Sequence, residues 1–241
     1  MRLEKNMIAQ RQKSILDAVI REHIRTARPV ASQDIRERYR HISPATIRHE
    51  MSQLDEEGYL EQPHTSAGRV PTDEGYRSFV DRLTERVELP EREQKRIRAV
   101  FTAENDEEVF VRALGAAVLE LTGSFVAAGI FDDAVLYDLG FSEVLAEPEF
   151  REAEYLESFG RLIDELHQNH RNMAAYVEHE RHRVFIGHEN PMREARQCAM
   201  MLASWHHPRG FSGFLTILGP RRMDYRKNLG IMRYLEEEFG E

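Results

Sequence analysis

Basic side chains gather between residues 36 and 49, where Glu37 is the only acid. Four arginines lie in this stretch: Arg36, Arg38, Arg40 and Arg48. A guanidinium group binds phosphate oxygens through parallel hydrogen bonds, and the same planar group can hold the O6 and N7 atoms of guanine. The residue types therefore indicate a surface that binds nucleic acid, and the first three arginines are expected to contact backbone phosphates.

The segment ISPATIRHEM, residues 42–51, predicts the helix that presents part of this chemistry. A serine followed by a proline is a favoured helix start, because proline lacks only an N–H that would have no helical partner. Ile47, Met51 and Leu54 follow helical spacing and are expected to face a core. The helix start and the other face supply the candidate DNA contacts: Ser43, Thr46, Arg48, His49 and Ser52. We predict that this helix enters the major groove and that Arg48 contacts a guanine.

The surrounding pattern predicts a small DNA-binding domain over residues 1–87. Its expected elements, in order, are a helix over 8–25, a second helix over 32–39 capped by Ser32, the helix that begins at Ser43, strands over 59–63 and 69–71, and a helix over 73–87. This order is that of a winged helix-turn-helix. The turn between the two strands contains no acid and supplies four more candidate DNA contacts: His64, Thr65, Ser66 and Arg69.

Charge is unevenly distributed along the chain. The formal net charge is −9, yet residues 1–85 hold 14 Lys and Arg and 14 Asp and Glu, whereas residues 86–241 hold 19 and 28. Exposed charges further apart than about 10 Å are largely screened at moderate salt, so a local basic face can bind DNA on an acidic protein. The overall charge therefore does not exclude a nucleic-acid partner.

Beyond residue 87 the pattern changes to longer strands alternating with helices. Residues 88–123 contain Pro90 and two charged or amphipathic helices, and we expect a linker region there. Strands are predicted over 124–131, 135–141, 173–178, 183–187, 196–204 and 211–219, and helices over 151–168 and 224–239. Short connections between the strands indicate an α+β domain with a mostly antiparallel sheet over 124–241.

The chain resembles the heat-inducible transcription repressor family, HrcA. The stretches that carry the resemblance are RQKSILDAVIREHI, PVASQDI, SPATIRHEMSQLDEEGYLEQPHTSAGRVPTDEGYRSFVDRL, EFREAEYL, VFIGHENP and LGPRRMDYRKNLGIMRYL. The resemblance implies a GAF-like second domain and a dimeric repressor of heat-shock (chaperone) genes that binds an inverted-repeat operator. It also implies an active fold assisted by a GroEL-type chaperonin, and we expect such a repressor to be nucleoid-associated when it is bound to its operator.

One departure from the family concerns dimerisation. Its members are usually longer and carry an inserted dimerising region within the GAF-like domain. Here SFVAAGIFDDAVLYDLGFSEVL passes almost directly to EFREAEYL, so we expect a short member without that insert. The apolar stripes of the helices at 106–122 and 224–239 are then the candidate dimer surfaces.

Histidines in the second half of the chain leave open an alternative, a winged-helix regulator that responds to a metal ion or a small-molecule ligand. HQNH (167–170) and HERH (179–182) space histidines three residues apart, which suits a zinc or nickel site on one helix face. No cysteine accompanies them, so solvated histidines are the expected state, and no metal or other cofactor is predicted. A small-molecule effector in the second domain also stays open.

Catalysis and membrane insertion find no support in the sequence. It contains no GxSxG, HExxH, P-loop or GxGxxG pattern, so we do not expect an enzyme. No apolar run approaches the roughly 18 residues of a membrane span, and the single cysteine, Cys198, cannot form an internal disulfide. A cytoplasmic protein is the simplest expectation, with a protein–protein adaptor as a further alternative to the DNA-binding one.

Overall fold

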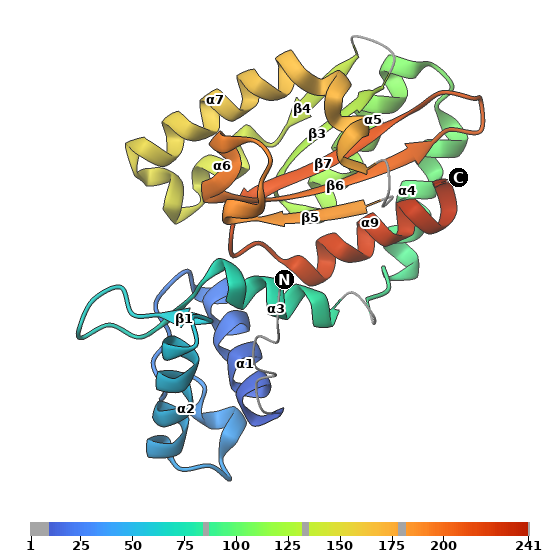
Figure 1. The fold of residues 1–241 in the computed structure, drawn as a ribbon. Coiled ribbons are helices and arrows are strands. Elements are labelled where there is room, and N and C mark those ends of the chain that lie inside the picture. Colours follow the sequence, from blue (N-terminus) through green and yellow to red (C-terminus); the bar gives the residue numbers. More distant parts are fainter. Residues whose placement is uncertain (1–9, 84–86, 132–134, 178–181, 241) are drawn as a thin grey trace, which may run out of the picture. The chain divides into compact units, whose positions relative to one another are not determined.

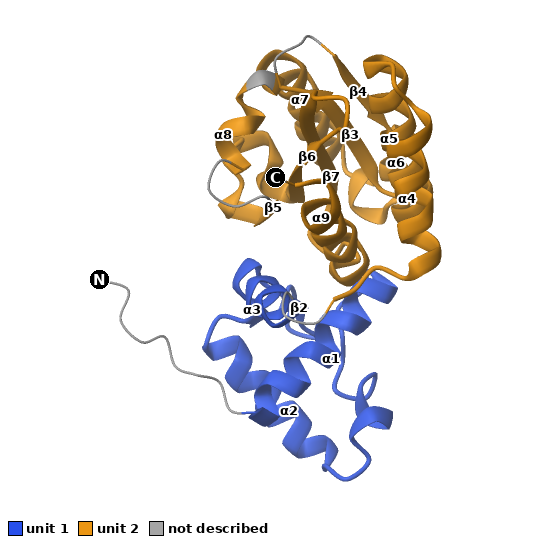
Figure 2. Ribbon diagram, turned by 90° about the vertical axis from the view of Figure 1, so that its right-hand side faces the viewer, with its two compact units in different colours: residues 1–83 blue, residues 84–241 orange. Residues whose placement is uncertain are grey.

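The computed structural model describes residues 10–83, 87–131, 135–177 and 182–240. The chain divides into two compact units, residues 1–83 (unit 1) and residues 84–241 (unit 2), which Figure 2 distinguishes by colour. Each unit is described by itself. Among the described residues no helix combines the length and the apolar character that crossing a membrane requires.

Unit 1 consists of helices and a two-stranded hairpin (Figure 1). Its elements are α1 (Gln10–Thr26), the 3₁₀ helix η1 (Arg36–Tyr39), α2 (Pro44–Glu56), β1 (Leu60–Glu61), β2 (Val70–Pro71) and α3 (Asp73–Leu83). Each long helix buries one apolar stripe, as its sequence spacing predicts. The core side chains include Ile15, Leu16, Val19, Ile47, Met51, Leu54, Tyr76, Phe79 and Val80. An ion pair between Arg82 and Asp17 and a hydrogen bond between His23 and Tyr76 join α3 to α1.

The predicted helix over 32–39 is wrong in type and extent. Only η1 is helical, and it is held by i to i+3 hydrogen bonds, such as that from the Arg38 N–H to the Ile35 carbonyl at 3.2 Å. Ser32 does not start a helix, and residues 32–35 form a turn instead. In it the Asp34 N–H donates to the Ala31 carbonyl at 3.0 Å, and the Asp34 carboxylate accepts from the Ala31 N–H at 2.7 Å. The segment is therefore a turn followed by one tight helical turn.

Unit 2 contains an antiparallel sheet between two layers of helices. Its elements are α4 (Glu91–Ala103), α5 (Glu107–Thr122), β3 (Phe125–Ile130), β4 (Leu136–Leu139), α6 (Phe141–Ala146), η2 (Pro148–Arg151), α7 (Ala153–Asn169), η3 (His170–Asn172), α8 (Met173–Val177), β5 (His182–Ile186), η4 (Gly187–Glu189), η5 (Arg193–Gln197), β6 (Cys198–His206), β7 (Ser212–Pro220) and α9 (Tyr225–Phe239). The described strands pair in the order β4-β3-β7-β6-β5, every pair antiparallel. The expected α+β class with a mostly antiparallel sheet is confirmed.

The two faces of the sheet are covered by different helices. Helices α6, α7 and α8 contribute Val144, Phe159 and Met173 to a core with Phe125 and Met200 of the sheet. Helices α5 and α9 pack against β3 and β6, and α4 packs on α5. Figure 2 shows α7 and α8 on one side of the strands and α5 with α4 on the other. The central strands β3, β6 and β7 are almost wholly buried, as strands covered on both faces must be.

Two expectations for unit 2 differ from the structure. The predicted strand 173–178 is the helix α8 up to Val177, and residue 178 lies outside the described residues. Met173 and Val177 are four residues apart and both buried, which fits helical spacing, and short apolar runs are ambiguous in this respect. The region 88–123 contains α4 and α5, as expected, but these helices belong to compact unit 2.

The two proposed dimer stripes are also used inside unit 2. Helix α5 turns Phe110, Leu114 and Val118 toward the sheet, and α9 buries Leu229 and Leu235. Most of the two apolar faces, at 106–122 and 224–239, is therefore covered within the unit, and Val109 is the stripe residue that remains 49% exposed. These faces do not remain as broad exposed dimer surfaces, which corrects that expectation.

Residue His207 gives unit 2 an expected pH dependence. Its ring is buried, stacked on Phe211 at 4.3 Å between ring centroids, and burial lowers its pKa below the usual value. The unfolded chain therefore binds a proton more readily, so the free energy of unfolding of unit 2 should fall as the pH drops below about 6.5. Unfolding followed by fluorescence of Trp205, the only tryptophan, reports on this unit. A His207→Gln variant should show a smaller pH dependence, and an equal dependence in both proteins would contradict the prediction.

Candidate nucleic-acid interface

Helix α2 begins at the predicted residue and is capped as expected. The Ser43 side chain accepts a hydrogen bond from the Thr46 N–H at 3.0 Å, and Pro44 occupies the first turn. The Ser43 and Thr46 hydroxyl groups also bond to each other at 2.9 Å. Because the cap uses the Thr46 amide, among the described first-turn amides that of Ala45 remains for a phosphate oxygen, fewer than a bare helix start would offer.

The two faces of α2 divide as its sequence predicts. Ile47, Met51 and Leu54 are buried in the core of unit 1. Arg48 and His49 are exposed, while Thr46 and Ser52 are half-buried at the sides of the helix. The structure therefore places the predicted base-contacting side chains on the solvent side of one helix.

The arginine segment 36–40 is held against α1 by two side chains. Ile35 is buried, and the Tyr39 hydroxyl donates a hydrogen bond to the Ser14 carbonyl of α1 at 2.5 Å. Burial raises the pKa of Tyr39, which keeps that hydroxyl protonated. Arg36, Arg38 and Arg40 are exposed on this anchored turn. They therefore lie on a fixed segment of backbone, although the segment is not the predicted helix.

The loop between β1 and β2, residues 62–69, is called the hairpin loop below. The Gln62 side chain bridges the loop, because its amide donates hydrogen bonds to the Thr65 carbonyl at 3.2 Å and to the Ala67 carbonyl at 2.9 Å. His64, Thr65 and Ser66 are exposed at its tip. The loop thus presents the three predicted side chains on an internally bonded turn.

The base of the hairpin loop is tied to the chain that follows α1. Val30 and Arg69 exchange two backbone hydrogen bonds, each of 2.9 Å, and form an isolated antiparallel bridge. A Cβ atom on Gly68 would lie 2.4 Å from the Val30 carbonyl carbon and 2.5 Å from its oxygen. Only glycine allows the two backbones to approach this closely.

Arg69 differs from the other predicted contact residues. Its Nε donates to the Asp55 carboxylate of α2 at 2.9 Å, and the Arg69 side chain is 16% exposed. The guanidinium thus has a partner within unit 1 and connects the hairpin loop to α2. Arg36, Arg38, Arg40 and Arg48 instead make no hydrogen bond or ion pair with any described residue.

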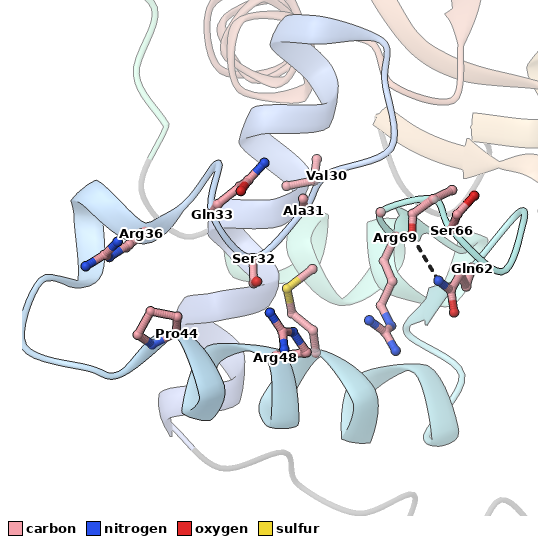
Figure 3. Close-up of a pocket in the computed structure, with 13 residues that line it drawn as sticks. Val30, Ala31, Ser32, Gln33, Arg36, Pro44, Arg48, Gln62, Ser66 and Arg69 are labelled. Atoms are coloured by element: carbon pink, nitrogen blue, oxygen red, sulfur yellow. Dashed lines mark hydrogen bonds between the residues drawn. The ribbon is translucent and has the colours of Figure 1, made fainter.

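Two grooves flank the first half of α2, and neither is lined by an acid. The hairpin groove, of about 430 Å³, lies between α2 and the hairpin loop (Figure 3). It is lined by Val30, Ala31, Ser32, Gln33, Arg36, Pro44, Arg48, Met51, Gln62, Ser66, Ala67, Gly68 and Arg69. The turn groove, of about 490 Å³, is lined by Gln10, Arg11, Ser14, Tyr39, His41, Ile42, Ser43 and Thr46. Both grooves thus combine cations and neutral hydrogen-bonding groups, the chemistry that suits an anionic backbone.

Several groove residues were not predicted from the sequence. Ser32, Gln33 and Gln62 line the hairpin groove, and Arg11 lines the turn groove while pairing with Glu50 at 3.4 Å. No period or motif marks these positions, because separate segments of the chain bring them together. The absence of acids from residues 62–69 is the one sequence signal that pointed to the hairpin loop.

Removing the Gln62 amide should loosen the hairpin loop. A Gln62→Met variant keeps the length of the side chain but loses both loop hydrogen bonds, each contributing about 1 kcal/mol. Exchange of the Ala67 amide, which bonds to the His64 carbonyl at 2.8 Å, should accelerate by about fivefold or more. Hydrogen exchange measured by NMR tests this, with Glu61→Gln at the exposed neighbouring position as the control. Unchanged exchange in Gln62→Met would show that the side chain does not order the loop.

The described histidines do not converge on a metal site. Among the described residues no group of three His, Cys, Asp or Glu side chains is placed to hold an ion. His167 lies 3.3 Å from Asp138, and His182 hydrogen-bonds to Glu236, so these two histidines have different partners. His179 of the HERH pattern lies outside the described residues.

Comparison with known proteins gives a consistent family match. The family model described as "HrcA protein C terminal domain" matches residues 31–229. The protein named "Heat-inducible transcription repressor HrcA" of Desulforamulus reducens is 49% identical over 119 residues, covering 49% of this chain and 32% of that protein. The protein of the same name from Desulforudis audaxviator is 55% identical over 91 residues, covering 37% and 26%. The matched part thus spans about a third of these relatives' length or less.

One solved structure shares the fold over nearly the whole chain. It is described as that of a hypothetical protein, has a TM-score of 0.76 and 19% sequence identity, and the match covers 96% of this chain and 97% of that one. At this identity the likeness concerns the fold alone.

Proposed function

The chain belongs to the HrcA family, and on that basis we propose that it is a DNA-binding transcription repressor whose unit 1 is a winged helix-turn-helix. The observation that carries the proposal is the surface around α2, where two grooves are lined by no acid and the hairpin groove is bordered by Arg36 and Arg48, which make no hydrogen bond or ion pair with any described residue. In an ordinary solvated surface of a neutral module, cations and acids would be interspersed, as on helices where Arg161 pairs with Glu157 and Arg233 with Glu237. Unit 2 would be the GAF-like regulatory part.

In this proposal each segment of unit 1 has a separate role. Helix α2 enters the major groove, where Arg48 and His49 face base edges from the first half of the helix. Arg36, Arg38 and Arg40 bind backbone phosphates, and the hairpin loop acts as the wing that meets the sugar-phosphate backbone or a minor groove through His64, Thr65 and Ser66. We assign Arg69 to holding the wing on α2, since its guanidinium already pairs with Asp55.

An inverted-repeat operator requires two copies of unit 1 related by a twofold axis. We therefore propose a homodimer in the cytoplasm that is nucleoid-associated when it is bound at operators of heat-shock genes. The relatives' name, "heat-inducible transcription repressor", supports this assignment. Assistance of folding by a GroEL-type chaperonin belongs to the same proposal and rests on family resemblance alone.

Selection of bound duplexes from a random library tests the proposed function. The full chain should retain a palindromic sequence whose half-sites are separated by about one helical turn or a multiple of it. Sedimentation of the retained duplex with the protein should give two chains per duplex. Enrichment of no sequence, with equal binding to all duplexes, would refute a sequence-specific repressor, and one chain per duplex would refute the dimer.

A further inference from the structure

Unit 2 contains a pocket whose charge is opposite to that of the unit. The pocket has a volume of about 710 Å³ and lies between α7, η5 and the turn after β7. Four arginines line it, Arg161, Arg193, Arg196 and Arg221, against two acids, Glu154 and Glu194. Residues 86–241 as a whole hold 19 Lys and Arg and 28 Asp and Glu. We call this site the arginine pocket. Its surplus of arginines over acids is unexpected in an acidic unit and suggests a bound anion.

Three of the four pocket arginines are only weakly engaged with the described residues. Arg193 and Arg196 make no hydrogen bond or ion pair with any described residue. Arg161 pairs with Glu157 one helical turn away at 3.6 Å, and both side chains are more than half exposed, so this pair is weak. The adjacent Arg222, by contrast, is 10% exposed and held by Glu147 and Glu149. Arg222 thus shows how a buried arginine is paired in this part of unit 2, whereas Arg161, Arg193 and Arg196 have no comparable partners among the described residues.

The acids of the pocket offset only part of the charge of its arginines, since two carboxyl groups line it against four guanidinium groups. Glu194 interacts with the carboxyl group of Glu165, whose pKa is raised by burial and then by Glu194. The contact with Glu165 lowers the pKa of Glu194, and the nearby Arg193 and Arg161 lower it further, so Glu194 is an ionised acid that faces these arginines. Glu154 is the other acid in the lining. The pocket therefore keeps a positive balance at neutral pH.

Neutral groups in the pocket also point to a ligand. The Gln197 side-chain oxygen is buried and has no hydrogen-bond partner among the described residues. A buried acceptor without a donor is costly, and a hydroxyl or N–H group of a bound molecule would satisfy it. Ser158 and Tyr155 add further polar groups to the same lining. A volume of this size is within the range of about 300–1,000 Å³ that holds small-molecule ligands.

We propose that the arginine pocket binds a small molecule carrying two or more phosphate or carboxylate groups. Guanidinium groups from η5, α7 and the turn after β7 would hold its anionic groups, and Gln197 would accept a hydrogen bond from it. Such a ligand would connect three segments that lie far apart in the chain. This inference goes beyond the proposed DNA binding, because no residue of unit 1 takes part in it.

Calorimetric titration of the full chain with pyrophosphate tests the proposal. We expect saturable binding that weakens at least tenfold in the double variant Arg193→Gln/Arg196→Gln, whose native side chains are exposed and make no hydrogen bond to a described residue. Arg112→Gln, at an exposed position on α5 across the sheet, is the matched control and should bind like the unaltered chain. Arg48→Gln removes a cation from the hairpin groove and should also leave pyrophosphate binding unchanged.

The outcomes separate this pocket from the proposed DNA surface. Binding that is lost in Arg48→Gln and kept in the double variant would place pyrophosphate in unit 1 and overturn the proposal. Equal losses in Arg112→Gln and the double variant would show unspecific attraction, and no saturable binding of pyrophosphate, citrate or ADP would also overturn it. Tighter binding of ADP or of citrate than of pyrophosphate, lost in the double variant, would support the proposal and assign a nucleotide or a carboxylate.

Discussion

Replacing Gly68 by alanine should destabilise unit 1 by about 3 kcal/mol and abolish specific DNA binding. The added Cβ would lie 2.4 Å from the carbonyl carbon of Val30 and 2.8 Å from the Ala31 nitrogen. These are backbone atoms, so no side-chain rotation can relieve the clash, and the two hydrogen bonds between Val30 and Arg69 must lengthen or break. The hairpin loop would then separate from the chain after α1.

Thermal unfolding of unit 1, followed by circular dichroism of its helices, measures the loss of stability, and fluorescence anisotropy of a labelled operator measures binding. The matched control is Gly160→Ala, because Gly160 lies in α7 with no atom within 4 Å of the added Cβ. That change should leave DNA binding intact and stabilise its helix by up to about 1 kcal/mol. A Gly68→Ala protein as stable as the unaltered chain would show that the bridge between Val30 and Arg69 contributes little.

Replacing Arg48 by alanine should lower affinity for the operator by about 1–3 kcal/mol, or roughly 5- to 150-fold, and relax specificity. Arg48 is exposed in the first half of α2, lines the hairpin groove and has no intramolecular partner among the described residues. Its removal therefore leaves no unpaired group in the protein, so the loss would reflect the contact with DNA. Binding to random duplexes should change much less.

Arg38→Ala is the matched comparison, since Arg38 is also exposed but lies on η1. It should weaken binding to operator and random duplexes alike and reduce the salt dependence by about one counterion. Titrations of both duplexes over a range of salt concentrations distinguish the two variants. Equal losses on the two duplexes for Arg48→Ala would refute base recognition by this residue and leave it as a phosphate contact.

The features of the candidate site that the sequence predicts correctly are those determined by neighbouring residues, such as a helix cap and the spacing of apolar residues. Ser43, Pro44 and the spacing of Ile47, Met51 and Leu54 fix both the start of α2 and its exposed face, and the structure confirms both. These signals depend on neighbours within a turn or two of helix, so one segment of sequence contains them. The α+β class and the antiparallel pairing of unit 2 followed in the same way from strand-like runs with short connections.

Much of what the sequence misses depends on contacts between distant segments. Tyr39 fixes η1 by reaching Ser14 on another helix. The turn at 32–35 is a local exception, since Ala31 and Asp34 bond to each other across it. The pairing of Arg69 with Asp55, which changes the expected role of that arginine, likewise joins residues 14 positions apart. The proposed dimer stripes failed for a related reason, since an apolar helix face shows that something covers it but not what does.

The hydrogen bonds and the ion pair that hold the segments around α2 affect the entropy cost of binding DNA. Gln62 bonds the hairpin loop to itself, Arg69 anchors it to α2, and Tyr39 anchors the arginine turn to α1. Segments joined in this way lose little conformational entropy when a partner arrives, because the folded unit has already restricted them. The surface is thus preorganised, and most of the free energy of each new contact with a duplex would appear as affinity rather than be consumed in ordering the protein.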